Sequence, residues 1–165
     1  MNLKAKWHAL AAVGTLTIAV AANAKPTRAA APACAPVTAA AVEGLFTEFN
    51  AAWATKNPDT VTNLFAKDGV LLATVSNVPR TDHTGIRDYF VSFLKGEPVG
   101  TINTSTIKLG CNMATRMGTW TVGLTNQNSG VRNNVKARYT FIYTYEDGKW
   151  KVGHLHSSMM PVSEG

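Results

Sequence analysis

The chain has 165 residues, of which 45% are hydrophobic, and a formal net charge of +6; this length suits one ordinary domain. Lys4, Lys6, Lys25 and Arg28 all precede residue 37, so residues 37–165 carry only +2. So small an excess of positive charge does not indicate the basic surface that nucleic-acid binding requires. We therefore expect no nucleic-acid partner.

Residues 1–24 have the three parts of a cleavable secretory signal peptide. Lys4 and Lys6 make a basic start, residues 9–20 form an apolar run, and residues 22–24 (Ala-Asn-Ala) supply small side chains for cleavage. The apolar run is shorter than the roughly 20 residues of a bilayer-spanning helix. The pattern predicts an exported protein, periplasmic or secreted, with no membrane segment after cleavage.

An Ala/Pro-rich linker is predicted for residues 25–36, because this composition buries too little apolar surface to fold. It leaves residues 37–165 as one domain. Cys34 and Cys111 are the two cysteines. An even count in an oxidising compartment favours a disulfide, and two unpaired thiols are the alternative. A bridge would close a loop of roughly 80 residues, worth on the order of 4 kcal/mol in the chain-entropy model.

Three helices are predicted in the first half of the domain, from apolar residues that recur every three or four positions. They cover residues 37–55, 59–65 and 85–93. Thr38, Asn57 and Thr84 are the expected N-caps, and Pro58 stands at the first position of the second helix.

Strands are predicted where the period of the apolar residues changes to two. They cover residues 70–75, 102–109, 113–124, 131–145 and 150–159. Helices first and long antiparallel strands afterwards predict an α+β domain, with three N-terminal helices packed on a curved antiparallel sheet. The last strands are apolar on both sides, so we expect the second face to be covered in a homodimer.

The C-terminal third of the chain resembles a known family. The similar segments are residues 137–143 (Ala-Arg-Tyr-Thr-Phe-Ile-Tyr), 147–152 (Asp-Gly-Lys-Trp-Lys-Val) and 154–161 (His-Leu-His-Ser-Ser-Met-Met-Pro). They resemble the association domain of calcium/calmodulin-dependent protein kinase II and bacterial SgcJ/EcaC family proteins. Together with the order of elements, the resemblance to the nuclear transport factor 2-like (SnoaL-like) superfamily covers about residues 40–162.

This resemblance implies a conical pocket between sheet and helices, and dimerisation through the sheet. The superfamily includes isomerases, dehydratases, cyclases and binding modules, so the fold alone does not select a function. The kinase branch has an arginine-rich pocket and assembles into rings, but Phe141 and Ser157 stand where two of those arginines align. No glycine-rich dinucleotide loop follows a strand, and we expect no cofactor.

His154 and His156 lie two positions apart on a predicted strand, so their side chains project to the same face. Either is a candidate catalytic acid/base. Packing at a dimer sheet, or a hydrogen bond to Ser158, is the alternative. A metal site would need further ligands, which only His83 and acids such as Asp82 supply; we predict no metal.

Arg138 stands in the middle of a predicted strand, where a desolvated guanidinium needs an anionic partner. We expect it either to bind a ligand carboxylate inside the cone or to pair with a buried acid such as Asp88 or Glu48. Arg87 and Tyr89 are candidate ligand-binding residues, because the resemblance puts this helix start near the pocket mouth.

Two further features have alternative interpretations. Asp82 and His83 form either a carboxylate–imidazole pair or a polar cluster at the helix start. Trp53, on the apolar face of the first helix, is either a core residue or a platform for a ligand.

The leading hypothesis is an exported, dimeric module that binds a small organic molecule in an apolar pocket with few polar groups. One alternative is an enzyme of the isomerase, dehydratase or cyclase type that uses a pocket histidine as acid/base. Another is an assembly domain without catalysis. Whether the protein is an enzyme stays open at this point.

Overall fold

The computed structural model describes residues 33–161; the predicted signal peptide and most of the predicted linker lie outside the described residues. The elements, in chain order, are α1 (Ala39–Ala54), α2 (Pro58–Thr62), β1 (Phe65–Leu72), α3 (His83–Phe93), the 3-10 turn η1 (Leu94–Gly96), β2 (Val99–Gly110), β3 (Met113–Thr125), β4 (Arg132–Glu146) and β5 (Lys149–Met159). Within this part of the chain, no helix has both the length and the apolar character needed to cross a membrane.

Local capping residues set where the helices begin. Thr38 and Asn57 cap α1 and α2 as predicted, each accepting hydrogen bonds from backbone N–H groups of the first turn. Asp82, not Thr84, caps α3: its carboxylate accepts a 2.7 Å hydrogen bond from the backbone N–H of Gly85. The predicted Thr84 cap is therefore wrong, and α3 begins two residues earlier.

The five strands form one sheet in the order β1-β5-β4-β3-β2. The four long strands are antiparallel, as predicted, but β1 pairs with β5 in parallel. The sheet is therefore mixed, which corrects the expectation of an antiparallel one. Its first strand also begins at Phe65 rather than residue 70, because residues 67–69 (Lys-Asp-Gly) lie in an irregularity of the strand instead of a turn before it.

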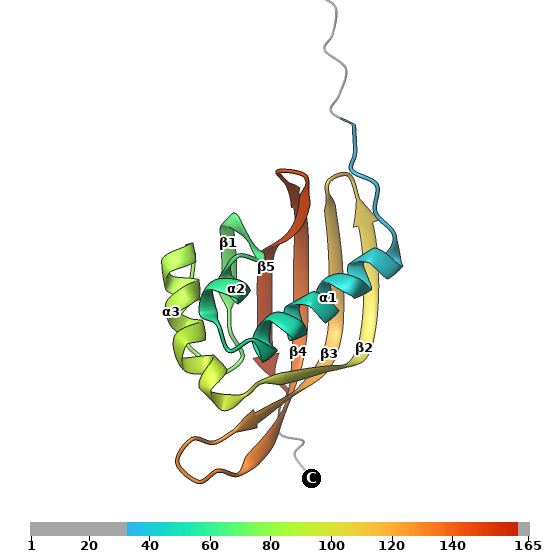
Figure 1. The fold of residues 1–165 in the computed structure, drawn as a ribbon. Helices are drawn as coiled ribbons and strands as arrows, with labels where there is room; N and C mark the ends of the chain where they lie inside the picture. The colour runs from blue at the N-terminus through green and yellow to red at the C-terminus, as the bar shows by residue number, and fades with distance from the viewer. Residues whose placement is uncertain (1–32, 162–165) are drawn as a thin grey trace, which may run out of the picture. The chain divides into compact units, whose positions relative to one another are not determined.

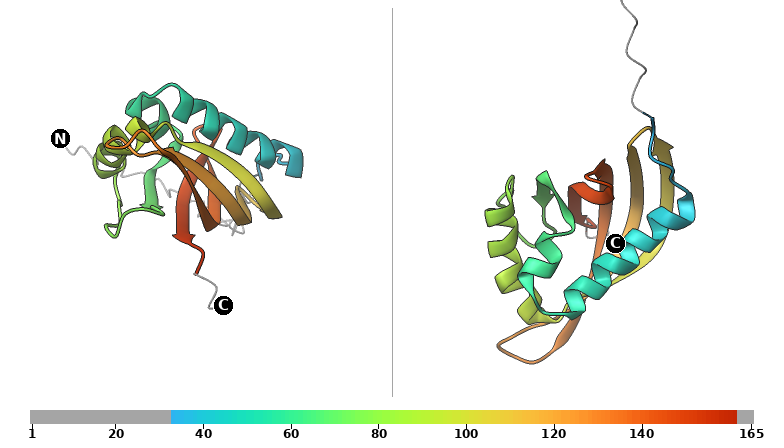
Figure 2. Two further views of the ribbon diagram at one scale, coloured as in Figure 1. Left: turned by 90° about the horizontal axis from the view of Figure 1, so that it is seen from below. Right: turned by 45° about the horizontal axis from the view of Figure 1, so that its top comes forward.

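The sheet curves around α1, which crosses its concave face from beside α2 to β2, while α3 lies beyond β1 (Figures 1 and 2). Aromatic side chains of α1 fill this concavity. Phe46 and Phe49 pack edge-on against Phe141 of β4, with ring centroids 6.2 and 5.4 Å apart. All three rings are buried, and each such burial stabilises the fold by about 1.5–3 kcal/mol.

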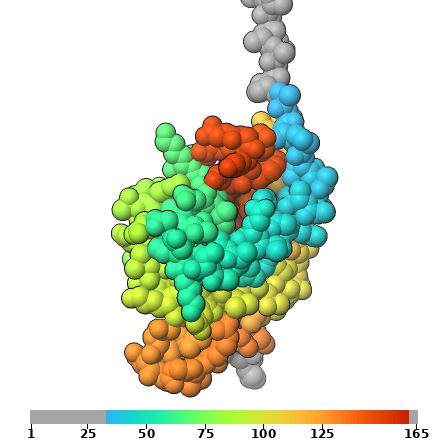
Figure 3. All heavy atoms as spheres, in the orientation of Figure 1, coloured from blue at the N-terminus to red at the C-terminus, as the bar shows by residue number. Residues whose placement is uncertain are grey.

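Seen from the helical side, α1, α2 and α3 cover the sheet, and the tip of the β3–β4 hairpin projects beyond them (Figure 3). The opposite, convex face carries the other residues of each strand. We call the surface formed by Arg138, Thr140 and Ile142 of β4 and their partners Ser158, His156 and His154 of β5 the outer face.

The predicted disulfide between Cys34 and Cys111 is present, with Cα atoms 4.8 Å apart. It ties the segment before α1 to the turn between β2 and β3. The backbone N–H of Ala35 adds a 2.8 Å hydrogen bond to Asn112 Oδ1 in that turn. Residues 33–36, expected to belong to a free linker, are thus attached to the sheet.

Candidate functional site: an apolar pocket in the cone

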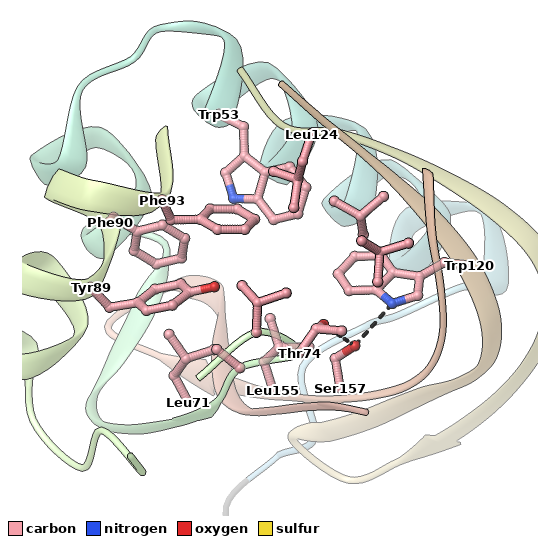
Figure 4. Close-up of a pocket in the computed structure, with 14 residues that line it drawn as sticks. Trp53, Leu71, Thr74, Tyr89, Phe90, Phe93, Trp120, Leu124, Leu155 and Ser157 are labelled. Carbon is pink, nitrogen blue, oxygen red and sulfur yellow. Dashed lines mark hydrogen bonds between the residues drawn. The ribbon is translucent and has the colours of Figure 1, made fainter. Parts of the chain in front are cut away.

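A pocket opens between α1, α3 and the concave face of the sheet (Figure 4). Eleven of its lining residues are apolar or indole side chains: Trp53, Leu71, Ala73, Val75, Phe90, Phe93, Trp120, Val122, Leu124, Val135 and Leu155. The other three are Thr74, Tyr89 and Ser157. No acid, lysine, arginine or histidine is among the lining residues, so the pocket is uncharged.

The cavity measures about 390 Å³ when counted to its open mouth, but only about 20 Å³ of it admits the centre of a water molecule. That is close to the space that one internal water needs. Aromatic side chains therefore occupy most of the cone. Tyr89 and Phe93 are only half-buried, so they are the rings whose displacement would enlarge the pocket.

Trp53 lies in the last turn of α1 and forms the roof of the pocket in Figure 4. Its indole ring is held by Phe49, Phe93 and Trp120, at centroid distances of 5.0, 5.3 and 5.9 Å. The side chain is 3% exposed, and its Nε1 atom has no hydrogen-bond partner in the described part of the chain. The nitrogen is on the edge of the ring that faces the cavity.

Tyr89 comes from α3 and directs its hydroxyl into the same space (Figure 4). Its ring stacks on Phe93 at 5.1 Å, and the guanidinium of Arg80 lies 5.5 Å from the ring centroid. Burial raises the pKa of the Tyr89 hydroxyl well above its usual value, with a smaller opposing effect of Arg80. The hydroxyl therefore keeps its proton at physiological pH and can donate a hydrogen bond.

The opposite wall has a polar cluster whose groups already bind one another. Trp120 Nε1 donates a 3.0 Å hydrogen bond to Ser157 Oγ, which also accepts from the Thr74 hydroxyl. The sequence did not point to Thr74 as a pocket residue, and it pointed to Ser157 only as a position where an arginine of the kinase branch's pocket aligns. The signal for Ser157 was available, because it is two positions from buried Leu155 on β5 and therefore shares its face.

His154 and His156 do share one face, as expected, but it is the outer face, opposite Ile142 and Thr140. Burial and the neighbouring His156 lower the pKa of His154 below its usual value. Neither imidazole lines the pocket. The lining of the cavity therefore contains no histidine that could act as the predicted acid or base.

Arg138 is exposed on the outer face, between the buried residues Ala137 and Tyr139 of β4. The expectation that it is desolvated inside the cone is wrong, because alternation along the strand points it away from the aromatic face. In the single chain its side chain is exposed, so it does not need a buried acid as a partner.

The buried arginine is Arg116 of β3, which is 6% exposed. Its Nε donates a 2.9 Å hydrogen bond to Ser105 Oγ, and its guanidinium lies 5.5 Å from the ring centroid of Phe46. Sequence reasoning missed it, although its position four residues before Trp120 puts both side chains on one face. It fastens β3 to β2 and α1 and does not line the pocket.

Arg87 also lies outside the pocket. Its Nε atom is 2.6 Å from Asp59 Oδ1, so the pair joins α3 to α2 at the surface. The hydrogen bond from Arg87 holds the pKa of Asp59 below its usual range. Asp82 and His83 are separately engaged, since Asp82 caps α3 and His83 Nε2 is 2.8 Å from the carbonyl oxygen of Ala66.

No group of three or more metal-binding side chains is found in residues 33–161. Of the residues that sequence reasoning proposed, the structure brings only Trp53 and Tyr89 together at the pocket. The outer face collects Arg138, His154 and His156, and Arg87 stands apart from both places.

The protein has a curved sheet, three helices packed against it, and an apolar cavity between the helices and the sheet. This arrangement is the cone of the nuclear transport factor 2-like class. The chain also matches the family model of the calcium/calmodulin dependent protein kinase II association domain over residues 38–161. It therefore belongs to that association-domain family. No curated protein matches the chain.

Solved structures agree with this assignment. A protein from Xanthomonas campestris, described as a calcium/calmodulin dependent protein kinase II association domain, is 46% identical, with a TM-score of 0.73 over 81% of this chain and 94% of that chain. A ketosteroid isomerase-like protein from Erwinia carotovora is 15% identical, with a TM-score of 0.62 over 74% and 96%. A dehydratase-like protein of Streptomyces avermitilis is 12% identical, with a TM-score of 0.64 over 73% and 94%. The last two show the fold alone.

Proposed function

We propose that the protein is an exported, homodimeric module that binds a small organic molecule in the pocket between α1, α3 and the sheet. One observation carries the proposal: the concave face encloses an uncharged, mostly apolar cavity into which the unpartnered Trp53 Nε1 is directed. Binding sites for small molecules are typically apolar, with a few convergent polar groups.

The composition of the pocket favours binding over proton-transfer catalysis. General acid/base chemistry needs a titratable group near neutral pH within reach of the substrate. The polar side chains of the pocket are Thr74, Ser157 and Tyr89 besides the two indoles, and burial moves the pKa of Tyr89 away from neutrality. The isomerase, dehydratase or cyclase alternative therefore lacks an acid/base group in this cavity.

Export is supported by the Cys34–Cys111 disulfide, because such bonds persist in oxidising compartments, and by the signal pattern of residues 1–24. Dimerisation is supported by the outer face, an antiparallel surface on which the chain itself only half-buries Ile142 and His154, so that a second copy can cover them. Closed pairing of identical faces is the commonest form of assembly.

Ligand binding is tested by thermal unfolding of the purified protein with a panel of small aromatic and alicyclic compounds. A compound present at 100 times its Kd should stabilise the fold by about 2.7 kcal/mol. Ala73→Leu places extra atoms in the cavity and should abolish the shift. Ala54→Leu, a matched change at an exposed position of α1, should preserve it. Unchanged unfolding with every compound would contradict the proposal.

A further inference from the structure

We infer that the pocket selects an uncharged ligand of about one ring that presents a single hydrogen-bond acceptor, such as a ketone oxygen, to the Trp53 indole N–H and the Tyr89 hydroxyl. This inference rests on the proposed function and specifies its ligand. The hydrogen-bonding state of each polar group in the cavity is the basis for it.

Two tryptophans line the cavity, and only one of them has a hydrogen-bond partner. Trp120 Nε1 donates to Ser157, whereas Trp53 Nε1 is buried among the rings of Phe49, Phe93 and Trp120, which offer it no acceptor. An indole N–H is only a donor, and a buried donor without a partner is costly. Trp53 Nε1 therefore lacks an acceptor, and the cavity is the space from which an acceptor can reach it.

Tyr89 adds a second donor to the same space. Burial keeps its hydroxyl protonated, and among the hydrogen bonds of residues 33–161 none involves this hydroxyl. Figure 4 shows its oxygen directed into the cavity, below the indole of Trp53. An acceptor with two lone pairs, such as a carbonyl oxygen, has one lone pair for each of these two donors.

The remainder of the site excludes a charged ligand. None of the lining side chains is ionised, and a desolvated carboxylate or ammonium group needs a paired charge. Arg80 lies over the ring of Tyr89 and is not among the lining residues. Leu71, Val122 and Leu155 offer an apolar surface for the body of the ligand. A ring reaches that surface only when the half-buried Phe93 moves aside and enlarges the pocket.

Three probes with nearly the same shape test this selection: acetophenone, α-methylstyrene and benzoate. Acetophenone has the ketone oxygen, α-methylstyrene has a methylene group in its place, and benzoate has a charged carboxylate. The affinity of the purified protein for each is measured by calorimetry and by quenching of tryptophan fluorescence. Acetophenone should bind, and benzoate should bind at least about 100-fold more weakly because of its desolvation.

The variants Trp53→Phe and Tyr89→Phe each remove one donor and keep an aromatic ring. Because the two neutral probes differ in hydrophobicity, the decisive quantity is the change in their affinity ratio. Each variant should weaken acetophenone about tenfold and leave α-methylstyrene nearly unchanged. Trp120→Phe is the matched control, because the Trp120 indole N–H already donates its hydrogen bond to Ser157. This variant should preserve the ratio of the two affinities.

A second measurement does not depend on the stability of any variant. The indole N–H signals of the ¹⁵N-labelled wild-type protein should include one that moves downfield with acetophenone and not with α-methylstyrene. Three results would overturn the inference while leaving ligand binding intact. They are an indole N–H signal that does not move with acetophenone, an equal loss of affinity for both neutral probes in Trp53→Phe, and tighter binding of benzoate than of acetophenone. Absence of binding by all three probes would overturn the inference and count against the proposed function itself.

Discussion

Trp120 and Ser157 are joined by a 3.0 Å hydrogen bond from the indole nitrogen to the serine oxygen, although β4 separates their strands in the sheet. Because both residues line the pocket, the bond crosses β4 on the concave side of the sheet. Both side chains are buried, so bulk solvent does not reach the indole N–H in place of this partner. Ser157 therefore supplies the hydrogen-bond acceptor for the indole N–H of one of the two pocket tryptophans.

We predict that Ser157→Ala lowers the free energy of unfolding by about 1–3 kcal/mol, because it leaves the Trp120 N–H buried without a partner. Urea unfolding followed by tryptophan fluorescence measures this loss. Ser92→Ala is the matched control: its residue lies at an exposed position of α3 and should change stability by less than about 0.5 kcal/mol. Equal effects of the two changes would contradict the prediction.

The disulfide should contribute a large part of the stability. Replacing both Cys34 and Cys111 by alanine opens a loop with a sequence separation of 77 and should cost on the order of 4 kcal/mol. Urea unfolding in the presence and absence of reductant measures it. Reductant should destabilise the wild type by a similar amount and leave the double variant unchanged. A double variant that remains sensitive to reductant would show that the bond is not the cause.

Stability should depend on pH through His154. Its pKa is lowered in the folded protein by burial and by His156, so the unfolded chain takes up the proton first. The contribution of the neutral imidazole is complete above the unfolded pKa of about 6.5 and is lost as the pH falls through the lower folded value. Stability should therefore decrease from pH 7 to pH 5.

The variants separate the two causes of this shift. His154→Gln should flatten the pH dependence in that window, and His156→Gln should reduce it only in part, because burial remains. Urea midpoints at half-unit pH steps provide the measurement. A slope that is unchanged in His154→Gln would assign the effect to another group.

The proposed dimer is tested at the centre of the outer face. Thr140 pairs with His156 there, and Thr140→Arg would bury a charge between two copies, which is costly without a partner. We predict that the wild type sediments as a dimer and that this variant dissociates at least about 100-fold more readily. Thr47→Arg, at an exposed position of α1, should remain dimeric. A wild-type monomer would remove the dimer from the proposal.

Much of the fold was readable from the chain. The helix starts at Thr38 and Asn57 and the four long strands depend on contacts between near neighbours, namely caps and period-two alternation. Alternation also indicated the face of Arg138, because its neighbour Tyr139 belongs to the aromatic side of β4. The wrong expectation for Arg138 came from weighing its charge above its position in the strand.

Other features depended on tertiary structure. Asp82 and Thr84 are both good N-caps, and the structure shows that Asp82 accepts the capping hydrogen bond from Gly85. The parallel pairing of β1 with β5 joins segments about 85 residues apart, and no local signal specifies its direction.

The pocket is the clearest case of this division. Local sequence patterns specify the order of helices and strands, the apolar side of each strand with the outward face of both histidines of β5, and the pair of cysteines available for a disulfide. Packing between distant elements decides that Trp53 and Tyr89 face one cavity and that Ser157 accepts the hydrogen bond of the Trp120 indole. A cavity is formed by side chains from elements far apart in the chain, so its contents depend on how those elements pack.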